Sequence, residues 1–509
     1  MSAGRLRVLR RLLRIVAAIG SVLVLTGSVS PVVTHAAPMP PLPPPDCASV
    51  SPPLRYVVLF DPETPERHAT QAIRAACGAS VAYYPQIGVA VATSAEPGFA
   101  GRFGADRAYS AQAEALSAPQ QAEPTSPKAN DTAVTRTADQ LPAAAQALGT
   151  DRSAEQWGME LIHAPQARTI NRGSPEVVVA VLDAGIDATH PDLATAVDPA
   201  RSAGCLSGKP DQTPAAWSPS TSTHGTHVAG TIAAADDGRG VTGVAPGIRL
   251  ASVKVVDDDE FIYPEYAVCG FMWAAQQQMR IANSSFFLDP WLLTCSNVPG
   301  QAVAYEAVRR AVQYATAHGM LSVAAASNER MDLSNPRQDV HSPNNAPHPQ
   351  PRVVDQHCDV LPAELPGVIA VSAVGAQRVK SEYSSYGLGV IAVTAPGGDL
   401  AQQPEASADG CVLSTVPGGY GYSCGTSMAA PHASGVAALL ASSLPSARPD
   451  ELAALMREQA DPLPCPAHTD LDAVCAGDDT LNGFYGHGLV DALTAVNAQP
   501  ASAPDRADR

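Results

Sequence analysis

From Trp157 onward the chain alternates short runs of apolar, often β-branched residues with segments long enough to form helices. The runs are nearly continuously apolar, so strands formed from them would be buried on both faces, as in a parallel sheet. Helical segments between parallel strands imply right-handed βαβ units, and hence an α/β fold whose parallel sheet is sandwiched by helices. We expect strands at 177–182, 250–256, around Ile281, 320–325 and 368–373, and helices beginning near His224, at 266–278 and at 302–317.

Residues 54–118 follow a different pattern, in which short β-type runs accompany one segment with helical spacing. The β-type runs are 55–60, 81–84 and 89–93, and the helical segment is 65–77. This order predicts a small α+β domain. Residues 119–150 are rich in Ala, Pro, Gln, Thr and Ser with little periodicity, which is typical of an exposed linker that a protease can cut. The α/β domain is expected to span 151–497, before a polar tail at 498–509.

The first 36 residues are typical of an export signal. Several arginines precede an apolar run at 15–25, and the small residues at 34–36 offer a cleavage site. A membrane anchor is the alternative, but the run is shorter than the roughly 20 residues that a spanning helix needs. A Pro-rich spacer follows at 37–53. We therefore expect a secreted protein with no stable membrane anchor in its mature form.

Charge and cysteine content narrow the class of partner and the compartment. The formal net charge is -17, which disfavours a nucleic-acid surface because phosphates are held by Lys and Arg. Ten cysteines predict disulfides in an oxidising compartment. Cys411 with Cys424, and Cys465 with Cys475, are near enough to close short loops, although spacing does not fix the pairing. A metal site is the rival account for the group His341, His348, His357 and Cys358, but its spacing matches no zinc pattern.

Ligands of an open parallel sheet bind at the carboxyl ends of the strands, so residues directly after the strands are candidates for a site. Asp183 stands at the end of the first expected strand, where the sheet would hold a carboxylate rigidly. An ordinary Asp at a strand end is the alternative reading. Asp187 and Asp192 are nearby competitors, but they fall in the following loop, which suits solvent or calcium better than a fixed catalytic acid.

Two histidines lie at the start of the expected helix near residue 224. His224 has Gly225 beside it and can present its ring into a cleft, where it would act as a base near neutral pH. His227 lies one turn further on, beside apolar residues, and is expected to be a packed, hydrogen-bonded core histidine.

Ser427 lies in the run Ser423-Cys424-Gly425-Thr426-Ser427-Met428-Ala429-Ala430-Pro431-His432, which continues into an apolar helix. A serine at a helix N-terminus is placed where backbone N–H groups and the helix dipole stabilise an oxyanion. A simple N-cap is the alternative.

Asn328 lies in the loop that follows the expected strand at 320–325. Its side chain can donate a hydrogen bond to the same oxyanion. A turn-forming Asn is the alternative there.

The chain order Asp, His, Ser, with these flanking motifs, resembles the subtilisin family of serine peptidases. The resemblance runs from about Trp157 to Val496 and includes Tyr485-Gly486-His487-Gly488-Leu489-Val490-Asp491. It implies a subtilisin-like peptidase in which Asp183 supports the imidazolium of His224, His224 takes the proton of Ser427, and Ser427 forms an acyl-enzyme. The resemblance further implies that Asn328 and the Ser427 amide form the oxyanion hole, and it assigns substrate-binding positions to Ser285, Phe286, Ala326 and Ser327.

The family resemblance also implies an inhibitory propeptide at 54–118, which would act as the chain's own intramolecular inhibitor before being cut away. Protein or peptide substrates are the expected partners, and no cofactor is expected. The chain departs from the family pattern where Phe286 and Phe287 follow Ser285, and where Ser327 replaces the usual Gly before Asn328. The segment 235–240 is too short for the calcium loop that some members have, so a structural calcium ion at Asp192 is only an open alternative.

The expected function is that of a broad secreted endopeptidase made as an autoprocessed zymogen, and three other functions are alternatives to it. A dedicated processing protease would fit the bulky Phe286 and Phe287. A non-catalytic binding protein of the same fold would have no need of the four groups Asp183, His224, Ser427 and Asn328. A nucleotide-binding α/β protein would need a Gly-rich phosphate loop after the first strand, where Asp183 stands instead.

Overall fold

The computed structural model describes residues 47, 52–117, 135–136, 149–404, 407, 409–466 and 473–498. All of them belong to one compact unit of the chain. The predicted export signal, most of the predicted linker and all but the first residue of the predicted tail lie outside the described residues.

A seven-stranded parallel sheet is the centre of the larger part of the chain. Its strand order is β16-β15-β11-β9-β6-β8-β7, and every pair of neighbours is parallel. The bounds are β6 Val178–Asp183, β7 Ala203–Gly204, β8 Arg249–Lys254, β9 Ile281–Ser284, β11 Leu321–Ala325, β15 Ile369–Val374 and β16 Val393–Pro396. The predicted parallel α/β sheet is confirmed. Strand β6 lies between β8 and β9, which puts the carboxyl ends of these strands beside one another.

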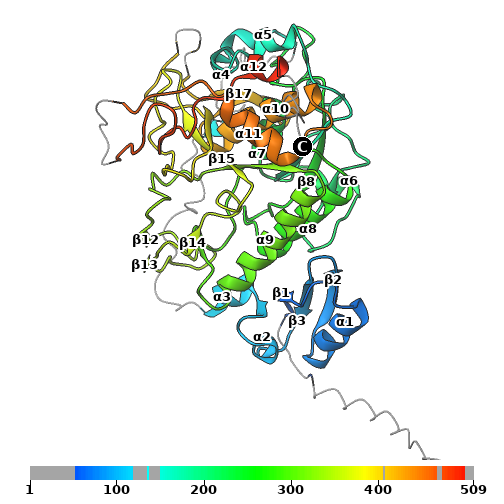
Figure 1. Cartoon of the computed structure of the whole chain (residues 1–509). Helices are drawn as coiled ribbons and strands as arrows, with labels where there is room; N and C mark the ends of the chain where they lie inside the picture. Colours follow the sequence, from blue (N-terminus) through cyan, green and yellow to red (C-terminus); the bar gives the residue numbers. More distant parts are fainter. Residues whose placement is uncertain are drawn as a thin grey trace, which may run out of the picture. The chain divides into compact units, whose positions relative to one another are not determined.

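Helices cover both faces of this sheet because successive side chains of each strand point to opposite faces. Val179 and Val181 of β6 pack into the hydrophobic cluster that includes α7 (His224–Ala233) and α10 (Thr426–Ser443). The intervening residues of β6 pack into a second cluster with α8 (Pro264–Gln276) and α9 (Gln301–Ala317). Figure 1 shows α8 and α9 lying side by side. The sheet is therefore buried on both faces, as its nearly continuous apolar runs predict.

Shorter elements complete the larger part. Strands β17 (Val412–Val416) and β18 (Gly419–Ser423) form an antiparallel ribbon that leads into α10, and β5 (Thr135–Arg136) pairs with β18. The other strands form two small ribbons, β10 (Thr294–Cys295) with β14 (Cys358–Asp359) and β12 (Gln338–Asp339) with β13 (Arg352–Val353). The remaining helices are η3 (Ser153–Glu155), α4 (Trp157–Leu161), α5 (Ala164–Arg168), α6 (Pro214–Trp217), α11 (Pro449–Glu458) and α12 (Ala492–Val496). None of the helices in the described ranges is long and apolar enough to cross a bilayer.

The early segment, residues 54–117, forms a four-stranded antiparallel sheet with the order β2-β3-β1-β4. Its elements are β1 Leu54–Leu59, α1 Glu66–Ala75, β2 Ala79–Tyr84, β3 Val89–Ser94, α2 Phe99–Phe103, β4 Ala108–Tyr109 and α3 Ala111–Ser117. One face of the sheet packs on Ile73 and Phe99. The other face joins the cluster that contains α8 and α9. Arg310 of α9 adds hydrogen bonds from its guanidinium to the carbonyls of Phe60 and Ile87.

Five disulfides contain all ten cysteines. Cys411 pairs with Cys424 and Cys465 with Cys475, so both short loops suggested by the spacing are closed. The other pairs are Cys47–Cys77, Cys205–Cys269 and Cys295–Cys358. Cys358 is thus bonded to sulfur, and the alternative that it serves as a metal ligand together with nearby histidines is wrong.

Candidate active site

Asp183 and His224 meet at the carboxyl end of the central strand β6. Asp183 is the last residue of β6 and is 1% exposed, and His224 is the first residue of α7. His224 Nδ1 lies 2.8 Å from Asp183 Oδ1 and 3.0 Å from Oδ2. The Ala184 amide also donates to Oδ1, at 2.7 Å. The carboxylate therefore accepts a hydrogen bond from Nδ1–H, which fixes the orientation of the ring and leaves Nε2 as the basic nitrogen.

His227 is a core histidine, as predicted. Its side chain is buried, and Nε2 lies 3.0 Å from the carbonyl oxygen of Val412 and 3.2 Å from that of Gly421. Burial lowers the pKa of His227 to about 3, because a charged imidazolium loses its hydration there. A group that stays neutral and bonds two carbonyls cannot exchange protons near neutral pH, so His224 is the candidate base.

The two competing carboxylates are committed to other contacts. Asp187 accepts hydrogen bonds from the amide and the hydroxyl of Thr189. Asp192 is buried rather than solvated, and it accepts from Tyr420 Oη at 3.1 Å and from the Val241 amide at 3.0 Å. The donors around Asp192 are thus hydroxyl and amide groups of the protein. In the part of the chain that the structure describes, no group of three or more His, Cys, Asp or Glu residues is placed to hold a metal ion.

Ser427 is the second residue of the 18-residue helix α10 and is 6% exposed. Its hydroxyl donates to the Ser285 carbonyl at 3.1 Å, and the Ser285 hydroxyl donates to the Ser427 carbonyl at 2.9 Å. Buried Asn283 donates to Ser285 Oγ at 3.0 Å. These bonds tie the end of β9 to the start of α10. They hold Ser427 where the dipole of a long helix favours negative charge.

Asn328 follows β11 and is fixed by the residue before Ser427. Its Oδ1 accepts from the Thr426 amide at 2.9 Å and from Thr426 Oγ1 at 2.8 Å. Because the oxygen end of the side-chain amide is held by two donors, the NH₂ end is the one that can donate to another group. A side-chain N–H donor beside the N-terminus of α10 matches the layout of an oxyanion hole.

One cleft brings most of the candidate residues together. It is lined by Asp183, His224, Ser285, Phe286, Ser327, Asn328 and Ser427, among others. Seven of the eight predicted site residues therefore line the same cleft. Ala326 does not line it. Its side chain is buried in the core with that of Ala324, whereas Ala325 faces the cleft, because side chains alternate along extended backbone.

Ser327 occupies a backbone conformation that favours glycine, with φ of 79°. A non-glycine residue in the left-handed region costs on the order of 1–3 kcal/mol, so surrounding contacts must hold it. Ser385 supplies them: its hydroxyl lies 2.8 Å from Ser327 Oγ and accepts from the amides of Glu329 and Met331. The side chain of Ser327, which replaces the Gly that is usual in the family, therefore helps to hold the loop at the cleft in place.

Glu329 is a cleft residue that sequence reasoning missed. It lines the cleft beside Asn328, and its carboxylate lies 3.0 Å from His341 Nε2. Its position directly after Asn328, in the same motif, could have indicated that it lies at the cleft. The sequence offers His341 only as a candidate metal ligand, and no sequence pattern links it to Glu329.

The chain is similar in sequence to known proteins. The sequence profile of the Subtilase family matches residues 174–488. The chain is 33% identical over 338 residues to fervidolysin of Fervidobacterium pennivorans, a match that covers 63% of this chain and 42% of that protein. It is 32% identical over 293 residues to subtilisin NAT of Bacillus subtilis subsp. natto, which covers 57% of this chain and 62% of that protein. The match thus spans less than two thirds of either relative.

A solved structure shares the fold. The epidermin leader peptide processing serine protease EpiP of Staphylococcus aureus superimposes with a TM-score of 0.63 at 20% identity, and the match covers 89% of this chain and 100% of that one. The two proteins therefore share the parallel α/β architecture described above. The family profile covers more than half of the sequence and includes Asp183, His224, Asn328 and Ser427. This chain belongs to the subtilase family.

Proposed function

We propose that the chain is a serine endopeptidase that hydrolyses peptide bonds through an acyl-enzyme on Ser427. The observation that carries the proposal is the convergence of Asp183, His224, Asn328 and Ser427 on one cleft at the carboxyl edge of the sheet. The bond between Asp183 and His224 Nδ1 supports it further, since a general base needs an orienting partner.

The proposed reaction begins when Ser427 Oγ exchanges its hydrogen bond to the Ser285 carbonyl for one to His224. Nε2 takes the hydroxyl proton as Oγ attacks the substrate carbonyl carbon, and Asp183 stabilises the imidazolium. The oxyanion receives hydrogen bonds from the Ser427 amide and the Asn328 side chain. When the C–N bond breaks, His224 gives its proton to the leaving amine. Water then attacks the acyl-enzyme by the same steps, and the acid and Ser427 are released.

The early segment, which we assign to 54–118, is proposed to be an inhibitory propeptide of a secreted zymogen. It docks through specific polar contacts: Arg55 Nη1 donates to Tyr266 Oη at 3.0 Å and to the Leu206 carbonyl at 2.6 Å, and Trp291 Nε1 donates to Tyr109 Oη at 3.0 Å. Five disulfides support export to an oxidising compartment. The peptide bonds that self-processing would cut are expected in the linker at 119–150.

A narrower role as a dedicated processing protease is favoured by one observation. Phe286 and Phe287 both line the cleft directly after Ser285, so the substrate backbone would run beside two bulky rings. Digestion of a mixed peptide library separates the two roles, since a broad endopeptidase cuts many sequences and a dedicated enzyme cuts few.

The proposal is tested by covalent labelling with a fluorophosphonate, which reacts with serines that a neighbouring base activates. We expect one adduct, located by peptide mapping on Ser427, and loss of cleavage of an unfolded protein in proportion to labelling. Substitution His224→Ala should prevent the adduct, whereas Ser446→Ala, at an exposed serine in the loop after α10, should leave it unchanged. Labelling elsewhere, or a labelled protein that still cleaves, would contradict the proposal.

The proposed oxyanion hole gives a second expected result. Asn328→Leu should lower kcat by about 100- to 1,000-fold with little change in KM, because the lost hydrogen bond forms only as the oxyanion develops. Steady-state kinetics on a chromogenic peptide measure both constants. Thr426→Val, which removes the hydroxyl that orients Asn328, should cause a smaller loss that Thr426→Ser largely restores. An unchanged kcat in Asn328→Leu would exclude this role.

A further inference from the structure

One carboxylate in the wall of the candidate active-site cleft is part of an ion pair. Glu329 lines the cleft next to Asn328, and its carboxylate meets the imidazole of His341 at 3.0 Å. The Glu329 side chain is 11% exposed and that of His341 is 34% exposed. A histidine that is partly open to solvent and bonded to a cleft carboxylate can change the net charge of that wall when it titrates.

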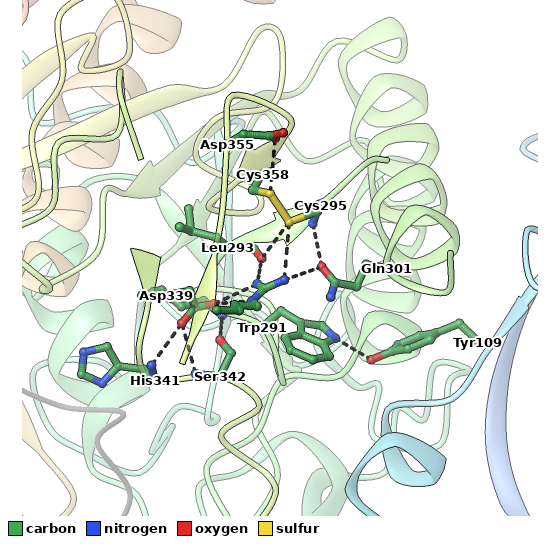
Figure 2. A network of polar contacts seen from close by, with 12 residues as sticks. Tyr109, Trp291, Leu293, Cys295, Gln301, Asp339, His341, Ser342, Asp355 and Cys358 are labelled. Atoms are coloured by element: carbon green, nitrogen blue, oxygen red, sulfur yellow. Dashed lines mark hydrogen bonds and ion pairs between the residues drawn. A yellow bond between two sulfur atoms is a disulfide. The ribbon is translucent and has the colours of Figure 1, made fainter. Parts of the chain in front are cut away.

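His341 is held in place by a buried network (Figure 2). Asp339, which is fully buried, accepts from the amides of His341 and Ser342, both at 3.1 Å. Arg352 pairs with Asp339 at 2.8 Å and stacks over the Trp291 ring at 4.4 Å. These bonds hold the backbone of His341, and the imidazole itself contacts Glu329. The strands β12 and β13, which flank the loop, therefore fix where His341 lies.

The charged groups around the pair decide what its titration does. The hydrogen bond that His341 donates to Glu329 raises the pKa of His341 above its usual 6.5, and the negative charges of Glu329 and Asp339 act in the same direction. Arg352 neutralises Asp339 through its own pair. Glu260 and Asp289 also line the cleft. Asp289 accepts from the Ile262 amide and from the Asn344 side chain.

We propose that His341 is a specificity-determining residue, which sets the charge that the cleft presents to the substrate side chain before the scissile bond through its ion pair with Glu329. The inference rests on the proposed peptidase function. Protonated His341 neutralises Glu329, so the wall accepts apolar side chains. Neutral His341 leaves a carboxylate that favours a lysine or arginine side chain of the substrate.

The sign of the pH dependence follows from the two charge states. Below the pKa of His341 the pair has a net charge of zero, and above it the net charge is −1. Because the hydrogen bond to Glu329 raises the pKa of His341 above its usual 6.5, the change in charge falls above that pH. Preference for a cationic side chain should therefore rise with pH, while a lysine side chain of the substrate stays protonated up to about pH 9.

The test compares two peptide p-nitroanilides that differ only in the residue before the scissile bond, lysine or norleucine. The ratio of their kcat/KM values cancels the titration of His224, which affects both alike. For the mature wild-type enzyme we expect this ratio to rise about fivefold between pH 6 and pH 9, as one partly screened unit charge can produce. His341→Gln should give a high ratio at every pH, and Glu329→Gln a low one.

Two further outcomes separate the possible failures. A pH-independent ratio in the wild type, or the same rise in His341→Gln, would overturn the role of His341. Cleavage of neither substrate at any pH would instead reject the proposed peptidase function. NMR titration of His341 in the Ser427→Ala protein provides a readout without catalysis: its pKa should fall when Glu329→Gln is added, and an unchanged pKa would also overturn the inference.

Discussion

Alanine in place of Ser427 is expected to lower kcat by about a million-fold, because no other group can form the acyl-enzyme. The fold should survive, since the lost hydroxyl makes a single hydrogen bond to the Ser285 carbonyl at 3.1 Å, worth about 1 kcal/mol. The precursor made with Ser427→Ala should keep its segment before residue 150, whereas the wild-type precursor should lose it. Intact-mass spectrometry of both proteins, together with cleavage of an unfolded protein, measures the two effects.

Ser446→Ala is the matched control for this experiment, because it removes a hydroxyl from an exposed serine just beyond the same helix. It should be trimmed and active like the wild type. Adding active wild-type enzyme to the Ser427→Ala precursor shows whether a second enzyme molecule can cut the linker. If the Ser427→Ala precursor is trimmed and active on its own, Ser427 is not the nucleophile, and a non-catalytic role for the cleft serine becomes the better explanation.

The substitution Asp183→Asn should lower kcat about 10,000-fold while leaving the fold intact. In the structure both carboxylate oxygens of Asp183 lie within 3.0 Å of His224 Nδ1, which places the ring proton on Nδ1. An amide NH₂ at that position would favour the other tautomer, with Nε2 protonated and unable to accept from Ser427. Single-turnover kinetics on an ester substrate would show whether acylation is the step that slows.

Asp187→Asn serves as the control, since Asp187 lies four residues further along and bonds Thr189 rather than a histidine. It carries the same change of charge near the cleft and should alter kcat by less than about tenfold. A comparable loss in both variants would mean that general electrostatics, and not the orientation of His224, explains the effect of Asp183.

The sequence predicted the framework of the site because strong local signals surround it. Asp183, His224 and Ser427 each stand at the boundary of an apolar strand or helix, and the expected strand at 177–182 differs from β6 (Val178–Asp183) by one residue at each end. Burial on both faces produces an apolar run that is easy to read. The nearby motifs then place polar residues at the carboxyl ends of the strands.

Other features had no local signal. The assignment of Ala326 to the cleft was off by one residue, because residues 324–326 are all alanine and the sequence carries no information on which of them faces which side. Strand β16 is short, ends at Pro396 and is defined by its parallel pairing with β15. The contact of His341 with Glu329 depends on the pair between Asp339 and Arg352, 13 residues apart in a segment without periodicity. Such contacts arise from tertiary structure alone.

The placement of the disulfides decides how the early segment can separate from the rest of the chain. Cys47–Cys77 lies before the linker, and the other four disulfides join cysteines between 205 and 475. No cystine therefore bridges the linker. A single peptide-bond cut within the linker at 119–150 would yield two polypeptides held by noncovalent contacts alone. Their separation would then be a dissociation equilibrium, which dilution shifts toward the separate polypeptides. A reducing agent is not needed for it, because there is no covalent link between them to break.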